Sequence, residues 1–232
     1  DQLADDGYAW WLDRVEHALE LSDMMRLDHF RGFQAYWAIP SDAPTAETGQ
    51  WRDGPGDDLF EAIRDAFGDA PFIAEDLGII TDEVRQLRRR QNLPGMKVMQ
   101  FGFHEDDDHP FLPHNYPELA VAYTGTHDND TTRGWYEKLE PDIRRRVRKY
   151  LSCEDQEVVT GMIAAILESK AALGVFPVQD LFDLGSEARM NTPGEPTGNW
   201  TWRMTGEMLE PGGQWEWLAS RTLESNRAQE RS

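Results

Sequence analysis

Strand-like and helix-like segments alternate along this chain, and the alternation restricts the folds that it can adopt. The strand-like segments are short apolar runs, found at residues 24–28, 71–74, 97–101, 119–124 and 175–182. Helix-like segments precede or separate these strands, at residues 8–21, 57–67 and 82–91. Thr81 is the expected N-cap of the helix at 82–91. A further helix is expected to begin at Ser152 and to stop at Gly174. This order is typical of parallel strands connected by helices. The sequence therefore predicts an α/β fold with a five-stranded parallel sheet.

Composition excludes several classes of protein. The chain has 232 residues, 39% of them hydrophobic, with 9 Trp and 10 Phe, which is enough to bury a core and unlike a disordered chain. No apolar run approaches the roughly 18 residues of a membrane span, so we expect no membrane association. Cys153 is the single cysteine, which rules out an intrachain disulfide and favours a reducing, cytoplasmic location. The absence of an initiating Met suggests a piece of a longer protein.

The charge balance argues against anionic partners. The formal net charge is -20, from 43 acidic and 23 basic residues. Such a surface repels nucleic acids and anionic membranes. Two explanations remain open: an ordinary acidic cytoplasmic enzyme, or adaptation to a high-salt cytoplasm in which screening relieves the self-repulsion. The dependence of the melting temperature on KCl concentration distinguishes them.

Three polar segments invite a binding role but have simpler explanations. The run from His104 to Pro110, HEDDDHP, matches no standard metal-ligand spacing, and we expect a solvated loop and no metal site. Two arginine runs, at 88–90 and 144–146, lie in acidic surroundings without interleaved aromatic residues. They are predicted to be solvated helix faces rather than a nucleic-acid patch.

Three carboxylates follow predicted strands: Asp28 in RLDHF, Glu75 in FIAEDLG and Asp128 in YTGTHDND. Parallel β/α proteins collect their chemistry at the C-terminal ends of strands. Glycosidic-bond chemistry needs one ionised and one protonated carboxyl group, so acidic residues repeated at these positions favour it. Any one of them, taken alone, is as well explained as a loop residue or a helix N-cap.

The neighbours of these acids suggest separate roles. On an extended segment Arg26 and Asp28 share a face, and a cation beside Asp28 would favour its ionised form, which a nucleophile requires. Arg26 is equally well explained as a structural ion-pair partner. Glu75 ends an apolar run, where desolvation would favour a protonated acid. His127 and Asp128 could together hydrogen-bond vicinal sugar hydroxyls.

Longer motifs resemble a known family. The segments RLDHFRGFQAYWAIP, IAEDLGIITDEV, YTGTHDNDTTRGW and EARMNTPGEPTGNWTWR, with KVMQFGF and FLPHNYP, are similar to motifs of the 4-α-glucanotransferases, also called amylomaltases or disproportionating enzymes. This family is a branch of the α-amylase clan. The similarity extends over nearly the whole chain.

The resemblance implies roles for individual residues. Asp28 matches the nucleophile, Glu75 the acid/base and Asp128 the transition-state stabiliser. Arg26 and His127 match partners of these groups, and Phe101 and Asn191 match residues that line the donor and acceptor subsites. Tyr36 and Trp37 could stack on glucose rings, but aromatic residues after a strand are more often part of the core.

The resemblance also implies a fold and a substrate class. Family members have a (β/α)8 barrel, a fold that takes about 250 residues, and residues 1–232 match the C-terminal portion of the catalytic domain, approximately strands four to eight. Without the first three strands, we expect the isolated piece to be inactive or to aggregate. The implied substrates are maltodextrins and α-1,4-glucans derived from starch or glycogen, with no cofactor and an unknown oligomeric state. A glucan hydrolase of the same clan, or a glucan-binding fragment, is the alternative.

Overall fold

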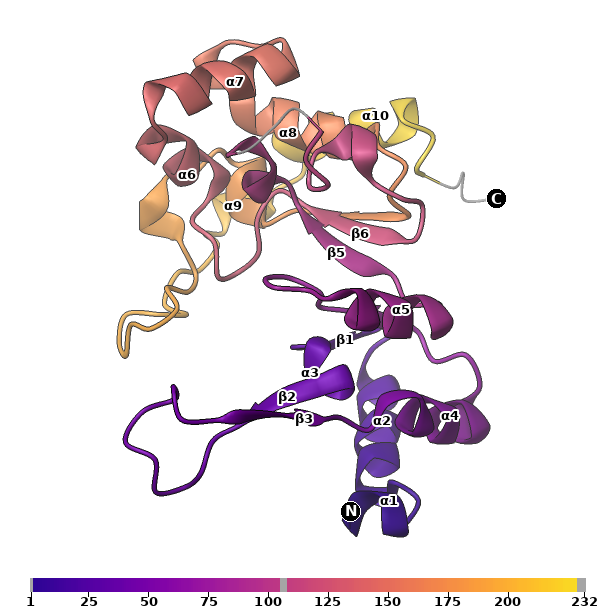
Figure 1. The fold of residues 1–232 in the computed structure, drawn as a ribbon. Coiled ribbons are helices and arrows are strands. Elements are labelled where there is room, and N and C mark those ends of the chain that lie inside the picture. Colours follow the sequence, from indigo (N-terminus) through magenta and orange to yellow (C-terminus); the bar gives the residue numbers. More distant parts are fainter. Residues whose placement is uncertain (1, 105–107, 229–232) are drawn as a thin grey trace. The chain divides into compact units, whose positions relative to one another are not determined.

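The computed structural model describes residues 2–104 and 108–228 (Figure 1). The chain divides into two compact units, Asp1–Met96 and Lys97–Ser232. Five strands form one sheet in the order β1-β4-β5-β6-β7, and the strand β5, Gly95–Val98, spans the boundary between the units. The strand pairs β1–β4, β4–β5 and β6–β7 are parallel. The predicted α/β fold with a five-stranded parallel sheet is therefore confirmed.

The first unit contains the parallel strands β1 and β4, the start of β5, an antiparallel hairpin and five helices among its described residues. Its elements are α1 Gln2–Asp5, α2 Ala9–Leu21, β1 Met25–Leu27, α3 Arg31–Gln34, β2 Ala35–Ala38, β3 Gln50–Asp53, α4 Gly56–Phe67, β4 Phe72–Ala74 and α5 Asp82–Arg90. Strand β1 pairs with β4 in the register Met25↔Phe72, Arg26↔Ile73 and Leu27↔Ala74. Ala74 in turn pairs with Gly95 of β5.

An aromatic cluster forms the centre of the first unit. The rings of Phe30, Phe33 and Phe60 lie 5.5–5.9 Å apart in tilted and edge contacts. Helix α4 contributes Leu59 and Ile63 to the same core, one helical turn apart, while its exposed face is charged. Two acidic residues in its first turn favour the start of the helix through its dipole. Burial of this face fixes the helix against the strands that carry the predicted site residues.

The antiparallel hairpin β2–β3 has no counterpart in the sequence prediction. Trp37 of β2 faces Trp51 of β3 with ring centroids 5.4 Å apart, and the Arg31 guanidinium lies 4.3 Å from the Trp51 ring centre. Tyr36 and Trp37 are exposed. The expectation that these two aromatic residues belong to the core is therefore wrong, because they lie on an exposed two-stranded hairpin and not against the parallel sheet.

The second unit packs helices around the remaining strands. Its elements are the 3₁₀ turns η1 Met99–Phe103, η2 Pro113–Asn115, η3 Asp155–Glu157, η4 Ser186–Ala188 and η5 Glu207–Leu209, the strands β6 Ala120–Tyr123 and β7 Leu173–Val175, and the helices α6 Thr132–Lys138, α7 Pro141–Leu151, α8 Val158–Leu167, α9 Val178–Leu181 and α10 Gln214–Glu224. Strands β6 and β7 are parallel, with Ala122 opposite Gly174. Helix α8 lies at the core, since Met162, Ile163 and Ile166 are fully buried.

Several predicted boundaries need correction. The strand predicted at 97–101 ends at Val98, and Phe101 lies on the 3₁₀ turn η1. The strand predicted at 175–182 is Leu173–Val175, and the following residues form α9 after Pro177, which lacks the N–H that a continued ladder needs. Ser152 ends α7 with a φ of 52° rather than starting a helix, and Gly174 lies in β7. Thr81 is at the N-cap of α5, but its side chain makes no capping hydrogen bond.

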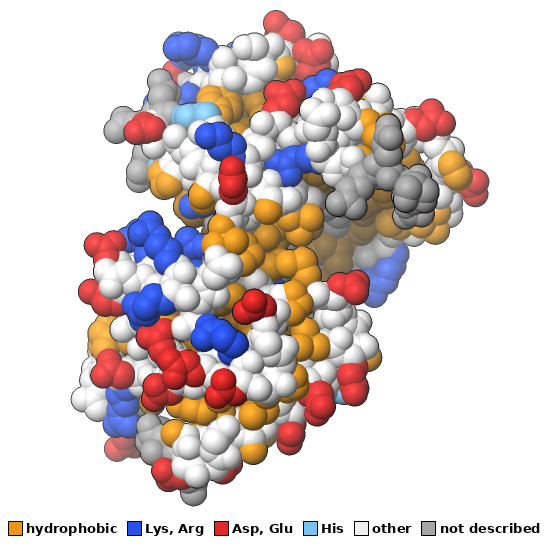
Figure 2. Space-filling model, turned by 90° about the vertical axis from the view of Figure 1, so that its right-hand side faces the viewer, with side chains coloured by type: hydrophobic (Ala, Val, Ile, Leu, Met, Phe, Trp, Pro, Cys, Tyr) orange, Lys and Arg blue, Asp and Glu red, His pale blue; other side chains and the backbone are white. Residues whose placement is uncertain are grey.

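The arginine runs are solvated in part, since Arg89, Arg90 and Arg145 are exposed, but other members make structural contacts. Arg88 pairs with Asp76 at 3.1 Å, with both side chains largely buried, so the prediction of a solvated face is wrong at this position. Arg90 binds Asp57 through two nitrogens, and Arg146 donates to the Phe103 carbonyl. Figure 2 shows basic side chains interspersed with acidic ones on the face that it presents. The contacts of Arg88, Arg90 and Arg146 hold parts of the fold together.

Neither a membrane-spanning helix nor a cluster of metal ligands is found in the described part of the chain. No helix in it is both long enough and apolar enough to span a bilayer. In the same residues, no group of three or more His, Cys, Asp or Glu side chains is arranged to hold a metal ion. Within the polar segment at 104–110, residues 105–107 lie outside the described residues.

An ion pair between exposed Lys138 and largely buried Asp130 helps to join α6 to the turn η4. Asp130 Oδ2 accepts hydrogen bonds from Lys138 Nζ at 2.5 Å and from Ser186 Oγ at 2.7 Å. Gly134 is required here, because a Cβ on it would lie 2.2 Å from Ser186 Oγ. Burial acts to raise the pKa of Asp130, but the hydrogen bonds from Lys138 and Ser186 outweigh it, and the pKa is lowered.

Replacing Asp130 by Asn should lower the free energy of unfolding by about 1–2 kcal/mol at neutral pH, because these charge-assisted hydrogen bonds are lost while Lys138 stays exposed. A carboxylate with a lowered pKa in the folded state stabilises the fold above its unfolded pKa of about 3.9, and loses this effect as the pH falls through the folded pKa. The difference in melting temperature between the two proteins should therefore shrink below about pH 4. A difference that stays constant down to about pH 3 would contradict this assignment.

Candidate active site

Asp28 and Glu75 follow directly after two neighbouring parallel strands. Leu27 and Ala74 are register partners in β1 and β4, so the next residue of each strand is the acidic one. Neighbouring strands lie about 4.8 Å apart, which makes the two backbones adjacent at this edge of the sheet. The sequence prediction of acidic residues at strand ends is confirmed for this pair.

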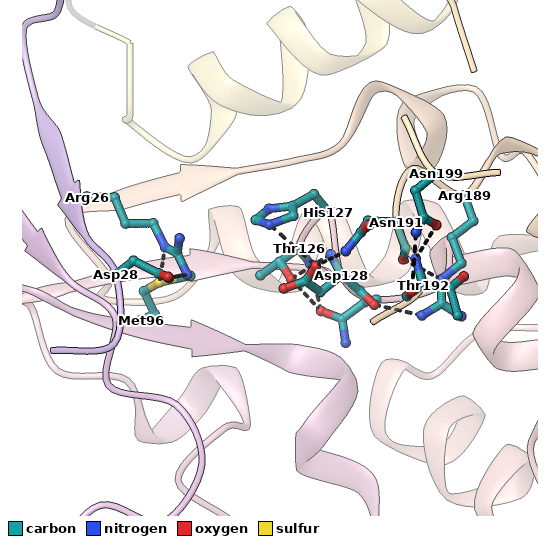
Figure 3. Close-up of polar contacts among 11 residues, drawn as sticks. Arg26, Asp28, Met96, Thr126, His127, Asp128, Arg189, Asn191, Thr192 and Asn199 are labelled. Atoms are coloured by element: carbon teal, nitrogen blue, oxygen red, sulfur yellow. Dashed lines mark hydrogen bonds and ion pairs between the residues drawn. The ribbon is translucent and has the colours of Figure 1, made fainter. Parts of the chain in front are cut away.

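Asp28 is paired with Arg26 on the same face of the chain. Arg26 Nη2 lies 2.7 Å from Asp28 Oδ1, and Arg26 Nε contacts the Met96 sulfur at 3.4 Å (Figure 3). Leu27, between them, is buried in the core. The Asp28 side chain is 74% exposed, so its second oxygen is accessible to a ligand. The alternation expected from an extended segment is therefore present.

Both carboxylate oxygens of Glu75 accept hydrogen bonds from the backbone. The His29 amide donates to Oε2 at 2.8 Å and the Leu77 amide to Oε1 at 3.0 Å. The Glu75 backbone is fixed as well, because its N–H donates to the Leu27 carbonyl at 3.0 Å and its carbonyl accepts from Phe30 at 3.0 Å. The side chain of Glu75 is thereby attached to the amide of the residue that follows Asp28.

His29 was missed by sequence reasoning, although it links the two carboxylates. Its φ is 49°, in the left-handed region that His tolerates better than most residues with a Cβ. Backbone outliers of this kind are found preferentially at functional sites. The RLDHFRG motif contains this residue, but sequence spacing alone does not reveal that its amide reaches the carboxylate of Glu75.

Asp76, which follows Glu75, has a different environment. Asp76 Oδ1 accepts the Met96 amide at 2.8 Å and Oδ2 pairs with Arg88. A Cβ on Gly95 would lie 2.5 Å from Asp76 Oδ2, so the carboxylate fills the space beside this glycine. As expected for successive residues of an extended segment, the two acids point in opposite directions, and Asp76 is structural.

A hollow of about 490 Å³ opens beside Asp28 within the first unit. Its lining combines the Asp28 side chain with aromatic and polar residues, including Trp11, His29, Tyr36 and Asp53. This volume is within the range of small-molecule sites, which combine aromatic walls with a few polar groups. The Asp28 carboxylate thus borders a space that a ligand can enter.

Asp128 lies in the loop after β6, within the second unit. Asn191 Nδ2 donates to Asp128 Oδ1 at 2.6 Å, and His127 Nε2 lies 3.5 Å from the same oxygen (Figure 3). Arg189 Nη2 donates to the Asp128 carbonyl at 2.7 Å. The predicted residues His127, Asp128 and Asn191 are therefore brought together, although the last is more than sixty positions away in the sequence.

The loop that carries Asp128 is braced internally. Asn129 Oδ1 accepts from both the amide and the hydroxyl of Thr126, at 2.9 and 2.8 Å. His127 contacts the ring of Trp200 at a centroid distance of 5.3 Å, and its carbonyl accepts the Asn191 amide. Arg189 and Trp200 were not predicted individually, although they lie in the motif that contains Asn191.

Phe101 is not joined to this cluster by a described contact. It lies on η1 with 40% of its surface exposed, and its ring contacts Phe111 edge-on at 5.8 Å. Among the described residues, no contact connects it to His127, Asp128 or Asn191. Its predicted place in a sugar subsite therefore stays a prediction.

Comparison with known proteins identifies relatives of this chain. A family model described as 4-alpha-glucanotransferase matches residues 1–209. The 4-alpha-glucanotransferase of Thermus thermophilus is 50% identical over 219 residues, which cover 91% of this chain and 44% of the relative. The chloroplastic/amyloplastic 4-alpha-glucanotransferase of Solanum tuberosum is 48% identical over 200 residues, covering 86% of this chain and 35% of the relative.

A solved structure shares the fold. The amylomaltase from Streptococcus agalactiae in complex with acarbose superposes with a TM-score of 0.93 at 34% identity, covering 98% of this chain and 46% of that protein. The chain thus spans less than half the length of the relatives that it matches. On the family match and these relatives, the chain belongs to the 4-alpha-glucanotransferase family.

Proposed function

We propose that the protein carrying this chain transfers segments of α-1,4-glucans between maltodextrin donors and acceptors by a retaining double displacement. The observation that carries the proposal is the position of Asp28 and Glu75 directly after the register partners Leu27 and Ala74, with the His29 amide bound to Glu75. Retaining enzymes of this class hold two carboxyl groups about 5–5.5 Å apart. Membership of the family supports the same activity.

In the first step, Glu75 gives its proton to the glycosidic oxygen while Asp28 attacks the anomeric carbon. The bond between that carbon and the leaving oxygen breaks, and one glucan leaves with a free 4-hydroxyl. The remaining glucan is held as an ester of Asp28. In the second step Glu75 takes the proton of an acceptor 4-hydroxyl, whose oxygen attacks the same carbon and releases Asp28 as a carboxylate.

The surroundings of the two acids fit these roles. The Arg26 guanidinium at 2.7 Å stabilises the negative charge that Asp28 needs for attack and regains on release. The amides of His29 and Leu77 fix the position of the Glu75 carboxyl group. The group therefore keeps the same orientation when it donates the proton in the first step and accepts one in the second. Neither step changes an oxidation state, and we propose that no cofactor or metal takes part.

Asp128 is proposed to accept hydrogen bonds from vicinal hydroxyls of the reacting sugar. Asn191 and His127 both contact Oδ1, so Oδ2 is the oxygen proposed to bind the substrate. His127, Asn191, Arg26 and Phe101 are the proposed substrate-binding residues. The amylomaltase of Streptococcus agalactiae, which binds acarbose, supports a glucan-binding role for the corresponding surface.

We also propose that residues 1–232 form the C-terminal portion of a (β/α)8 catalytic domain, approximately strands four to eight. The match to less than half of each of these relatives supports a part of a larger domain, and the resemblance of the motifs is the ground for its position. The proposed location is the cytoplasm, because a chain with Cys153 as its single cysteine forms no intrachain disulfide and suits a reducing compartment. The proposed partners are maltodextrins and other α-1,4-glucans, and no nucleic acid or membrane.

Incubation of the intact enzyme with maltotriose should give glucose together with maltodextrins longer than the substrate, because a second glucan replaces water as the acceptor. Chromatography of the products measures this directly. Glucose and maltose alone would instead indicate a hydrolase, and unchanged maltotriose would indicate a glucan-binding protein.

Replacing Asp28 by Asn should lower kcat on the order of 10⁴-fold, because the amide cannot form the glycosyl ester, while maltotriose binding stays within about threefold. Initial rates and calorimetric binding measure the two effects. Asp23→Asn, at an exposed acid before β1, is the matched control and should leave both unchanged. A rate near that of the wild type for Asp28→Asn would remove the nucleophile assignment.

A further inference from the structure

A buried carboxylate outside the proposed chemistry lies beneath the loop that carries Asp128. Asp180 belongs to the short helix α9 and is 1% exposed. None of the ion pairs among the described residues involves it. Burying an acid without a cationic partner costs folding free energy unless hydrogen bonds satisfy its oxygens. The hydrogen bonds of Asp180 therefore indicate its role.

Asp180 accepts hydrogen bonds from both ends of the Asp128 loop. Thr124, the first residue after β6, donates its hydroxyl to Oδ2 at 2.5 Å. Thr132, the first residue of α6, donates its hydroxyl to Oδ2 and its amide to Oδ1, each at 2.7 Å. Both threonines are completely buried. One carboxylate therefore closes the loop 125–131 at its base.

The neighbouring contacts strengthen the same closure. Buried Gln100 donates through Nε2 to the Asp130 carbonyl at 3.1 Å, and its own amide donates to the Thr124 carbonyl at 3.3 Å. A Cβ on Gly125 would lie 2.7 Å from Gln100 Nε2, so the loop packs directly on this side chain. Little space is left for the base of the loop to move.

Helix α9 also holds the second segment that contacts Asp128. Gln179, next to Asp180, donates to the Ala188 carbonyl at 3.1 Å. Ala188 is followed by Arg189, which binds the Asp128 carbonyl, and the chain continues to Asn191, which binds Oδ1. The loop that carries Asp128 and the segment that contacts it are thus attached to two consecutive residues of one short helix, Asp180 and Gln179.

We propose that Asp180 is a positioning residue for the transferase reaction, which fixes Asp128 by tying Thr124 and Thr132 together. The inference rests on the proposed function, since it assumes that Asp128 binds sugar hydroxyls in the transition state. A displacement of about 1 Å at such a group can cost on the order of 10²-fold in rate. Substrate binding that relies on other subsites is affected much less.

The character of the site predicts which replacement is tolerated. Burial raises the pKa of Asp180, although the three hydrogen bonds from Thr124 and Thr132 oppose this shift. An Asn carboxamide can accept from the Thr132 amide through its oxygen and donate through its nitrogen to a threonine hydroxyl, which also accepts. Asp180→Asn can therefore close the same loop, whereas Asp180→Ala leaves three buried donors without an acceptor.

The test compares kcat and KM for maltotriose transfer in the intact enzyme, below the melting temperature of every variant. Asp180→Ala should lower kcat on the order of 10²-fold and Thr124→Val about 10-fold, with KM changed less than about threefold. Asp180→Asn and Thr124→Ser should stay within about threefold of the wild type, because hydrogen bonds to the loop are kept. If Asp180→Ala does not fold, Thr124→Val, which is nearly isosteric, decides the question.

Two controls separate this inference from general instability and from the proposed function. Met162→Ala removes buried side-chain volume from α8 in the same unit and should lower the melting temperature while kcat is kept. Asp128→Asn should be nearly inactive. An inactive Asp128→Asn together with a normal kcat for Thr124→Val, or an equal loss of kcat in Met162→Ala, would overturn the positioning role alone. An active Asp128→Asn would overturn the proposed role of Asp128 and this inference with it.

Discussion

The parallel pairing of β1 with β4 is the constraint on which the first unit depends. The register places Leu27 opposite Ala74, and the hydrogen bond from the Glu75 amide to the Leu27 carbonyl continues the ladder for one more step. A shift by one residue would turn Arg26 and Asp28 into the core and Leu27 out of it. The apolar burial that stabilises the sheet therefore also determines which side chains stand at its edge.

Sequence reasoning could predict this part of the molecule because it depends on local patterns. Apolar runs, their alternation with helices and the acids that end them are all visible along the chain. The hairpin β2–β3 escaped prediction because its strands are short, largely exposed and separated by a long connection, so that no burial pattern marks them. Pro177 was included in a predicted strand because the apolar residues around it outweighed its missing N–H.

The contacts among site residues were much less predictable, because they join distant segments. Asp128 and Asn191 lie in separate motifs. The two amides that bind Glu75 belong to the backbone, which every non-proline residue has, so the sequence does not reveal them. The predicted strand at 175–182 includes Asp180, yet this residue lies in α9, where three donors converge on it. Residue types indicated that carboxylate chemistry was available, but only the tertiary structure shows which residues contact each acid. Glu75 binds the amide of His29, next to Asp28, whereas the adjacent Asp76 binds the Met96 amide and Arg88.

The contact between Asp76 and Gly95 has a consequence for how this sequence can change over evolution. The Asp76 carboxylate occupies the volume that any side chain at position 95 would need, and it also binds Arg88 and the Met96 amide. A change at one of these positions therefore alters the requirements at the others. We expect residues 76, 88 and 95 to vary together among relatives, as a set linked by packing and charge.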